Sequence, residues 1–100
     1  MTKETNPAVI ADLWAVICDR SRNPSEASYT ARLLRDPKGI DKVLEKVGEE
    51  STEFILAAKN GVRQRTAEEA ADLLYHLLVA LRAADVDLAD VLAELEKRRR

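Results

Sequence analysis

The chain has 100 residues, of which 46% are hydrophobic and 34% charged, and we expect residues 1–100 to form one small domain with short flexible tails at 1–5 and 97–100. A net charge of −2 argues against nucleic-acid binding as the main task. No apolar run approaches the roughly 20 residues of a membrane span, and the single Cys18 excludes a disulfide framework within the chain, which fits a cytoplasmic protein.

The first predicted element is a helix that starts near Asn6 and Pro7 and ends at about Arg20. Asn6 is a suitable N-cap residue, and proline is favoured at the first helical position. Trp14 and Cys18 lie one turn apart, and we expect both to be packing residues; a reactive thiol at Cys18 would need a lowered pKa, for which the sequence gives no sign. Apolar residues recur at helical spacing along this segment, at Val9, Ile10, Leu13, Trp14, Val16 and Ile17.

A turn at residues 21–25 precedes a short predicted helix over residues 26–34, with Ser25 as its N-cap. Tyr29, inside this helix, suits an amphipathic core position. A second turn follows at residues 36–39, because Pro37 moves Asp36 out of helical conformation.

The central helix is predicted from Ile40 to Lys59 or Asn60, with Gly61 in the left-handed closing position. Glu50 lies at the edge of its apolar stripe and Glu53 farther round, so these acids should border the core. The stripe consists of Val43, Leu44, Val47, Phe54, Ile55 and Ala58.

A fourth helix is predicted over residues 66–84, with Thr66 and Glu69 forming a capping box. This helix is apolar nearly all the way round and should be largely buried. A carboxylate such as Asp72 in that setting costs several kcal/mol unless it is paired, hydrogen-bonded or bound to a metal. His76 falls on the same face one turn later, as either a hydrogen-bonded core residue or a ligand.

Asp87 is predicted to cap a last helix, after a break at residues 85–87. Its apolar positions are Leu88, Val91, Leu92 and Leu95. The basic residues 97–100 either stabilise the C-terminus of this helix or form a tail that binds a polyanion.

Two acidic triplets with the same offsets occupy the central and fourth helices, and each covers an arc of about 100°. They are Glu49, Glu50 and Glu53, and Glu68, Glu69 and Asp72. Such clusters are often solvated faces, but basic partners are scarce, with only Lys46 near the first triplet and none between Thr66 and Leu81. A divalent cation between the helices is the alternative, and oxygen-only donors select Mg²⁺ or Mn²⁺ over Zn²⁺.

Residues 50–53 (ESTE) followed by residues 69–72 (EAAD) resemble the ExxE…ExxD signature of the all-α nucleoside triphosphate pyrophosphohydrolases, the MazG-like superfamily. The flanking segments are similar to the phosphoribosyl-ATP pyrophosphohydrolase family over about residues 28–95. These segments are 28–30 (SYT), 39–44 (GIDKVL), 46–50 (KVGEE), 57–61 (AAKNG) and 69–76 (EAADLLYH).

The resemblance implies an all-α MazG-like bundle of about five helices, with two long antiparallel helices carrying the acids, assembled as a homodimer. It also implies Mg²⁺-dependent hydrolysis of phosphoribosyl-ATP to phosphoribosyl-AMP and pyrophosphate, the second step of histidine biosynthesis. Relatives are often fused to the phosphoribosyl-AMP cyclohydrolase of the next step, so contact with that enzyme is a further expectation.

Residue roles follow from the resemblance and from proximity. Glu49 would order the attacking water or act as general base beside Glu50, while Glu68 has the least defined role. The expected metal ligands are Glu50, Glu53, Glu69 and Asp72. The expected substrate contacts are Lys46 and Lys59 for phosphates, and Asn60, Tyr75 and His76 for ribose or base, with Tyr29 near the substrate end of the site.

Two alternatives of function stay open at this point. One is a house-cleaning nucleoside triphosphate pyrophosphohydrolase of the same fold. The other, from a different class, is a non-enzymatic helical dimerisation module whose acids only keep it in solution.

Overall fold

The computed structural model describes residues 5–99. Those residues contain no strand and five helices: α1 (Val9–Arg22), α2 (Tyr29–Leu34), α3 (Ile40–Lys59), α4 (Arg63–Ala83) and α5 (Leu88–Arg98). The predicted all-α class with about five helices is confirmed. Of the predicted tails, residues 1–4 and 100 lie outside the described part, and α5 continues through residues 97 and 98 instead of ending before them.

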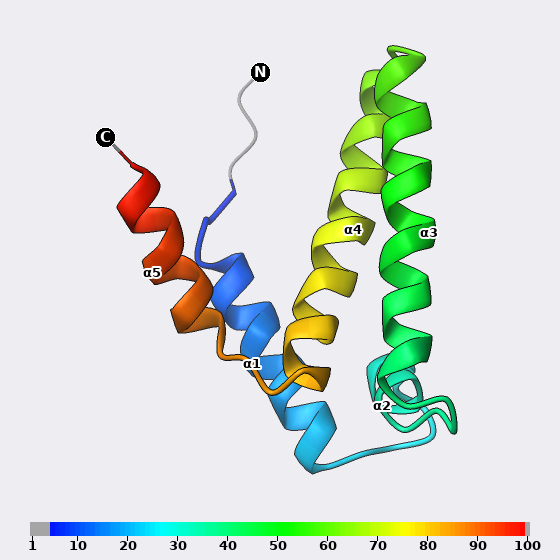
Figure 1. Ribbon diagram of the computed structural model, residues 1–100, viewed down its shortest axis with the longest axis vertical. Helices are drawn as coiled ribbons and strands as arrows, with labels where there is room; N and C mark the ends of the chain where they lie inside the picture. The colour runs from blue at the N-terminus through cyan, green and yellow to red at the C-terminus, as the bar shows by residue number, and fades with distance from the viewer. Residues whose placement is uncertain (1–4, 100) are drawn as a thin grey trace.

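The two long helices, α3 and α4, run antiparallel and side by side as a hairpin (Figure 1). They are joined by residues 60–62, where Gly61 takes the left-handed conformation with φ 71°. The predicted bounds of α3 and its closing glycine are therefore confirmed. α2 packs against α3 and α4 at the end of the hairpin away from this turn, and α1 packs against α2 and α4.

The start of α2 differs from the prediction. Ser28, and not Ser25, is the N-cap, because its hydroxyl accepts a hydrogen bond from the backbone N–H of Ala31 at 3.1 Å. Ser25 instead accepts from the N–H of Ala27 at 3.2 Å and closes the preceding turn. The helix is therefore shorter, and it begins at Tyr29.

The N-termini of α1 and α4 also differ. Asn6 accepts from the backbone N–H of Ala8 at 2.9 Å and so stabilises a turn ahead of α1, which begins at Val9. The predicted capping box in α4 is wrong, because the helix begins at Arg63 and Thr66 lies inside its first turns. The Thr66 hydroxyl donates to the carbonyl of Val62 at 2.9 Å.

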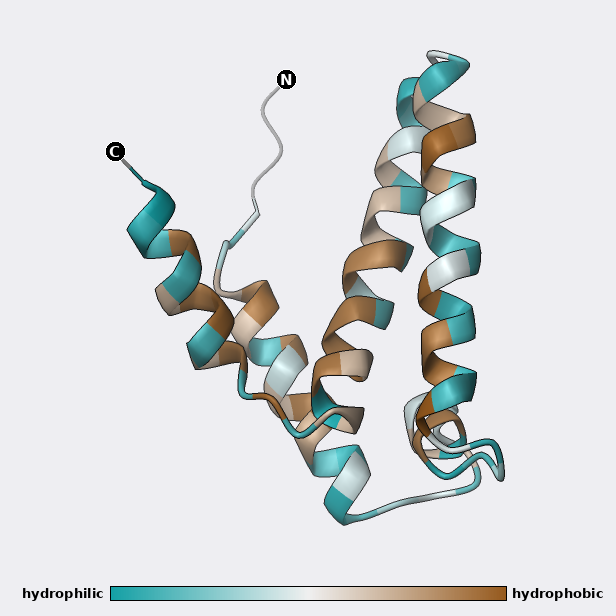
Figure 2. Ribbon diagram, viewed as in Figure 1, coloured by the Kyte–Doolittle hydropathy of each residue, from teal (hydrophilic) through white to brown (hydrophobic). Residues whose placement is uncertain are grey.

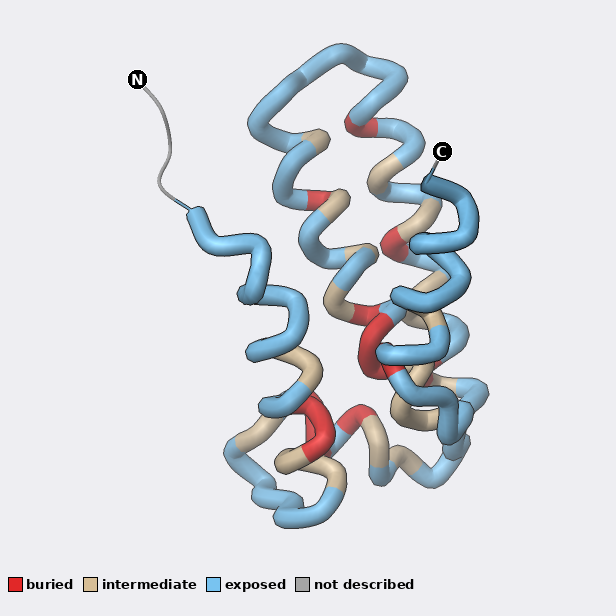
Figure 3. Tube along the Cα trace, turned by 90° about the vertical axis from the view of Figure 1, so that its left-hand side faces the viewer, coloured by how far each residue is buried: buried red, intermediate tan, exposed pale blue. Residues whose placement is uncertain are grey.

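The buried core takes at least one side chain from every helix, and it lies where α1 and α2 meet the hairpin (Figure 3). Trp14 packs against this cluster and Cys18 is buried, so the prediction that both are packing residues is confirmed. The cluster consists of Ile17, Leu33, Val43, Leu78, Val79 and Leu88.

Several predicted core positions are exposed in the single chain. Leu44 and Ile55 on α3 are exposed. Leu74 and Leu77 on α4 are exposed too, so the expectation that α4 is largely buried is wrong. Asp72 is exposed as well. The physical reason is that the other helices cover the hairpin mainly at one end. Hydrophobic residues occur along α1, α4 and α5 (Figure 2), and several of them are exposed.

Within residues 5–99, each helix is either too short or too polar to pass through the apolar part of a bilayer.

Ile17→Ala should destabilise the fold by about 2–5 kcal/mol, because the side chain is 1% exposed and its removal leaves a cavity among all five helices. Val16→Ala is the matched control on the same helix, since Val16 is 44% exposed, and it should cost less than about 1 kcal/mol. Urea unfolding followed by circular dichroism measures both. Equal losses would contradict the placement of the core.

Candidate metal and catalytic site

Two buried glutamates lie across the hairpin from one another. Glu50 on α3 is 7% exposed and Glu69 on α4 is 4% exposed. One carboxylate oxygen each from Glu50, Glu69 and Asp72 lie within 4.8 Å of one another. The antiparallel pairing of α3 and α4 thus brings together three of the four predicted metal ligands, with exposed Asp72 on the open side.

The fourth predicted ligand, Glu53, lies beside this group. Its carboxyl is near enough to raise the pKa of both Glu50 and Glu69, although Glu53 itself is exposed. Glu49 and Glu68, the remaining acids of the triplets, are exposed and form ion pairs with Lys46 at 3.0 Å and Arg65 at 3.4 Å, respectively. Each triplet therefore has a buried acid facing the other helix and an outer acid held by a cation.

Each buried glutamate has a basic residue four positions before it. Lys46 Nζ lies 3.9 Å from Glu50 Oε1, and Arg65 Nη2 lies 2.9 Å from Glu69 Oε1. No role was predicted for Arg65, because the helix was expected to start at Thr66. The i to i+4 spacing between Arg65 and Glu69 was the signal that could have identified this ion pair.

The second oxygen of each buried glutamate is left without a partner. Glu50 Oε2 and Glu69 Oε2 are buried and make no hydrogen bond. Burial, together with the neighbouring Glu53 carboxyl, raises the pKa of Glu50 above its ordinary value. The same two influences raise the pKa of Glu69 in spite of Arg65. Unpaired buried carboxylates are costly.

These features fit a hard divalent cation. All three convergent donors are carboxylate oxygens, the ligand type that Mg²⁺ and Mn²⁺ prefer. A cation between the helices would also satisfy the two orphaned oxygens, which neither Lys46 nor Arg65 contacts. The three carboxylates are therefore chemically suited to bind a divalent metal ion. The identity of each ligand stays a prediction.

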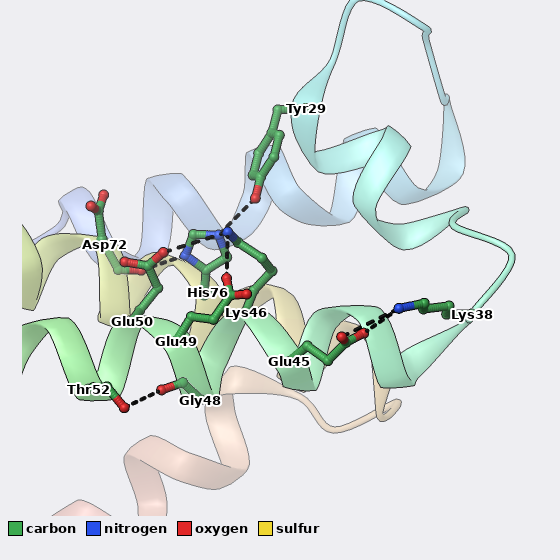
Figure 4. Close-up of polar contacts among 10 residues, drawn as sticks. All are labelled: Tyr29, Lys38, Glu45, Lys46, Gly48, Glu49, Glu50, Thr52, Asp72 and His76. Atoms are coloured by element: carbon green, nitrogen blue, oxygen red, sulfur yellow. Dashed lines mark hydrogen bonds and ion pairs between the residues drawn. The ribbon is translucent and has the colours of Figure 1, made fainter.

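The predicted substrate residues are spread along the hairpin. Asn60 lines a pocket of about 420 Å³ together with Glu53 and Arg65, next to the acids. Lys59 is exposed at the end of α3. Lys46, at the opposite end of the site, is half-buried between its two glutamates (Figure 4).

His76 is buried, and both of its ring nitrogens have protein partners. Nε2 lies 3.0 Å from the Tyr29 hydroxyl, and Nδ1 lies 2.8 Å from the backbone carbonyl of Asp72 (Figure 4). The geometry favours a hydrogen-bonded core histidine over a metal ligand. Tyr75, half-buried, is hydrogen-bonded to the Thr30 hydroxyl.

Residues 10–99 match the family model described as phosphoribosyl-ATP pyrophosphohydrolase. The phosphoribosyl-ATP pyrophosphatase of Methanoregula boonei is 73% identical over 92% of this chain and 88% of its own length. That of Methanosphaerula palustris is 67% identical over 96% of this chain and 97% of its own length. That of Haloarcula marismortui is 54% identical over 91% and 93% of the two chains. The family model matches nine-tenths of the residues of this chain, and the relatives are more than half identical to it. The chain therefore belongs to the phosphoribosyl-ATP pyrophosphohydrolase family.

Proposed function

We propose that this chain hydrolyses phosphoribosyl-ATP to phosphoribosyl-AMP and pyrophosphate, the second step of histidine biosynthesis. Membership of the family supports the reaction and the pathway. The observation that carries the site is the pair of buried, unpartnered oxygens on Glu50 and Glu69 beside Asp72. An acidic surface that served only to keep the protein in solution would have no reason to bury them.

Glu50, Glu69 and Asp72, with Glu53 beside them, would hold one or more Mg²⁺ ions, for which Mn²⁺ could substitute. When bound, a divalent ion neutralises charge that develops on phosphate oxygens. The chain's own contribution is a fixed group of anionic oxygens on two rigid helices, which sets where the phosphates can lie.

Glu49 is the proposed water-ordering residue. Its hydrogen bond to Lys46 lowers its pKa, so the carboxylate stays ionised at neutral pH and can accept a hydrogen bond from the attacking water. Glu50, one residue along, shares Lys46 and borders the same space. This arrangement supports catalytic roles for both residues.

Substrate phosphates carry negative charge, and Lys46 is the cation placed at the edge of the acidic site. We propose that Lys46 meets these phosphates. Asn60, in the pocket beside Glu53 and Arg65, is placed to contact the nucleoside or ribose part, with Lys59 next to it in the chain. Both ring nitrogens of His76 are hydrogen-bonded to Tyr29 and Asp72, so any influence of His76 on the substrate would pass through those partners. Tyr75, whose hydroxyl is hydrogen-bonded to Thr30, stays a predicted substrate contact.

A homodimer is part of the proposal. Exposed leucines on α4 and α5, and exposed valine and isoleucine residues on α1, leave apolar surface that a single chain does not cover. A second copy would cover it, and small domains often need such assembly for stability. A cytoplasmic location fits the free, buried thiol of Cys18. Contact with the phosphoribosyl-AMP cyclohydrolase stays a prediction.

Mg²⁺ at millimolar concentration should raise the thermal midpoint of the wild-type chain. An ion present at a hundredfold excess over its Kd stabilises the folded state by about 2.7 kcal/mol. Glu69→Gln should lose most of this response, while raising the midpoint in EDTA because a buried charge is removed. Glu45→Gln is the control, since Glu45 forms an exposed pair with Lys38 at 3.2 Å. An unchanged Mg²⁺ response in Glu69→Gln would remove that residue from the site.

Pyrophosphate release from phosphoribosyl-ATP tests the reaction itself. Glu50→Gln and Asp72→Asn should each slow it about a hundredfold or more, because charge stabilisation by a metal is worth several kcal/mol. The Glu45→Gln chain should keep wild-type rates. Faster release from dUTP or dCTP than from phosphoribosyl-ATP would instead indicate the house-cleaning activity.

Light scattering on a sizing column tests the dimer. The wild-type chain should elute at twice 11.2 kDa, the mass of one chain. Leu74→Asp should shift it toward the monomer, because a charge placed on an apolar interface is costly to bury, whereas Leu74→Met keeps the apolar contact. A wild-type monomer at micromolar concentration would contradict this part of the proposal.

A further inference from the structure

Two consecutive residues of α2 are hydrogen-bonded to two consecutive residues of α4. The Tyr29 hydroxyl lies 3.0 Å from His76 Nε2, and the Thr30 hydroxyl is hydrogen-bonded to Tyr75. The rings of Tyr29 and His76 also pack edge to face, with centroids 5.9 Å apart. α2 is thereby tied to α4 beside the acidic site by two polar contacts.

The direction of the hydrogen bonds through His76 follows from its partners. Nδ1 lies 2.8 Å from the backbone carbonyl of Asp72, and a carbonyl oxygen can only accept, so Nδ1 carries the proton. When the ring is neutral, Nε2 is the acceptor and the Tyr29 hydroxyl donates to it. The single proton of that hydroxyl is then used inside the protein. In that state the Tyr29 oxygen can only accept a hydrogen bond from outside.

Tyr29 is placed where a substrate could use this acceptor. Its side chain lies close enough to Lys46, Glu49 and Glu50 to interact with their charges, and the residue is 43% exposed. Figure 4 shows its hydroxyl pointing to His76, in the same region as the Lys46 amino group. His76, by contrast, is 6% exposed and has no free ring nitrogen.

We propose that His76 is a positioning residue that holds the Tyr29 hydroxyl as a hydrogen-bond acceptor for a hydroxyl or amino group on the nucleoside part of the substrate. The inference rests on the proposed function. Phosphate oxygens are acceptors, so Tyr29 could bond to them only by giving up His76. Tyr29 and His76 thus select for the part of the substrate that donates hydrogen bonds, while the phosphates are left to Lys46 and the acids.

Four variants separate this role from simple docking of α2. Tyr29→Phe removes the hydroxyl. His76→Asn keeps an amide that can donate to the Asp72 carbonyl, but it loses the acceptor for the Tyr29 hydroxyl. The side chain introduced by His76→Gln is longer and can place an acceptor near the Nε2 position. Thr30→Val removes the other contact between α2 and α4 and leaves Tyr29 in place.

Steady-state pyrophosphate release from phosphoribosyl-ATP is measured for each variant. Tyr29→Phe and His76→Asn should each raise KM about five- to tenfold, the loss of about one hydrogen bond, with a smaller effect on kcat. Their double variant should be no worse than either alone, and His76→Gln should recover much of the lost affinity. Thr30→Val should lower the thermal midpoint without changing KM. An equal rise of KM in Thr30→Val, or additive losses in the double variant, would overturn the proposal.

Nitrogen NMR of the ¹⁵N-labelled protein gives a readout that does not need activity. The chain contains one histidine, so its signals need no further assignment. We expect a proton-bearing Nδ1 and a bare Nε2 at neutral pH, in the wild-type chain and in Glu45→Gln alike. A proton on Nε2, in the opposite tautomer or in a charged ring, would overturn the proposal. Failure of the wild-type chain to cleave phosphoribosyl-ATP would contradict the proposed function, while the nitrogen signals would still report the hydrogen-bond direction.

Discussion

The main physical constraint on this structure is the burial of two carboxylates whose charge is only partly compensated by neighbouring cations. Glu50 and Glu69 each have one oxygen near a cation on the same helix and one oxygen with no partner. Hydrophobic packing elsewhere must offset this cost, since burying an unpaired charge opposes folding. Apolar side chains at these positions would avoid this cost, so the burial of the two acids supports the proposed metal site.

The rest of the chain holds these two residues in position. The core that joins all five helices lies at the end of the hairpin away from the turn between α3 and α4, and it fixes how α4 lies against α3. α2 closes the same end and brings the Tyr29 hydroxyl to 3.0 Å from His76 Nε2. The acids lie farther along the hairpin, on regular helix, where the spacing of side chains is set by the backbone and not by loops. The apolar core and the group of acidic residues therefore lie at successive positions along α3 and α4.

Much of this site could be predicted from the sequence because helical periodicity is regular. The repeated offsets of the two triplets placed Glu50, Glu69 and Asp72 on facing surfaces, and the structure brings their oxygens together. What failed depended on contacts between helices: Asp72 was expected to be buried and is exposed, while Glu50 and Glu69 are the buried acids. The helix start at Arg63 was missed because the Thr66 capping pattern is locally plausible. The Tyr29 to His76 hydrogen bond joins residues 47 positions apart, and nothing in the local sequence encodes it.

The two proposed partners of the single chain, a cation and a second copy, would act on different surfaces. A cation would satisfy the orphaned carboxylate oxygens between α3 and α4, which an apolar surface could not satisfy. A second copy would cover the exposed leucine side chains on α4 and α5, which no ion could cover. Because α4 carries both Glu69 and Leu74, packing of a second copy on α4 would also restrict how far the acids can move. Assembly and metal binding should then reinforce each other, since each would rigidify the helix that the other needs ordered.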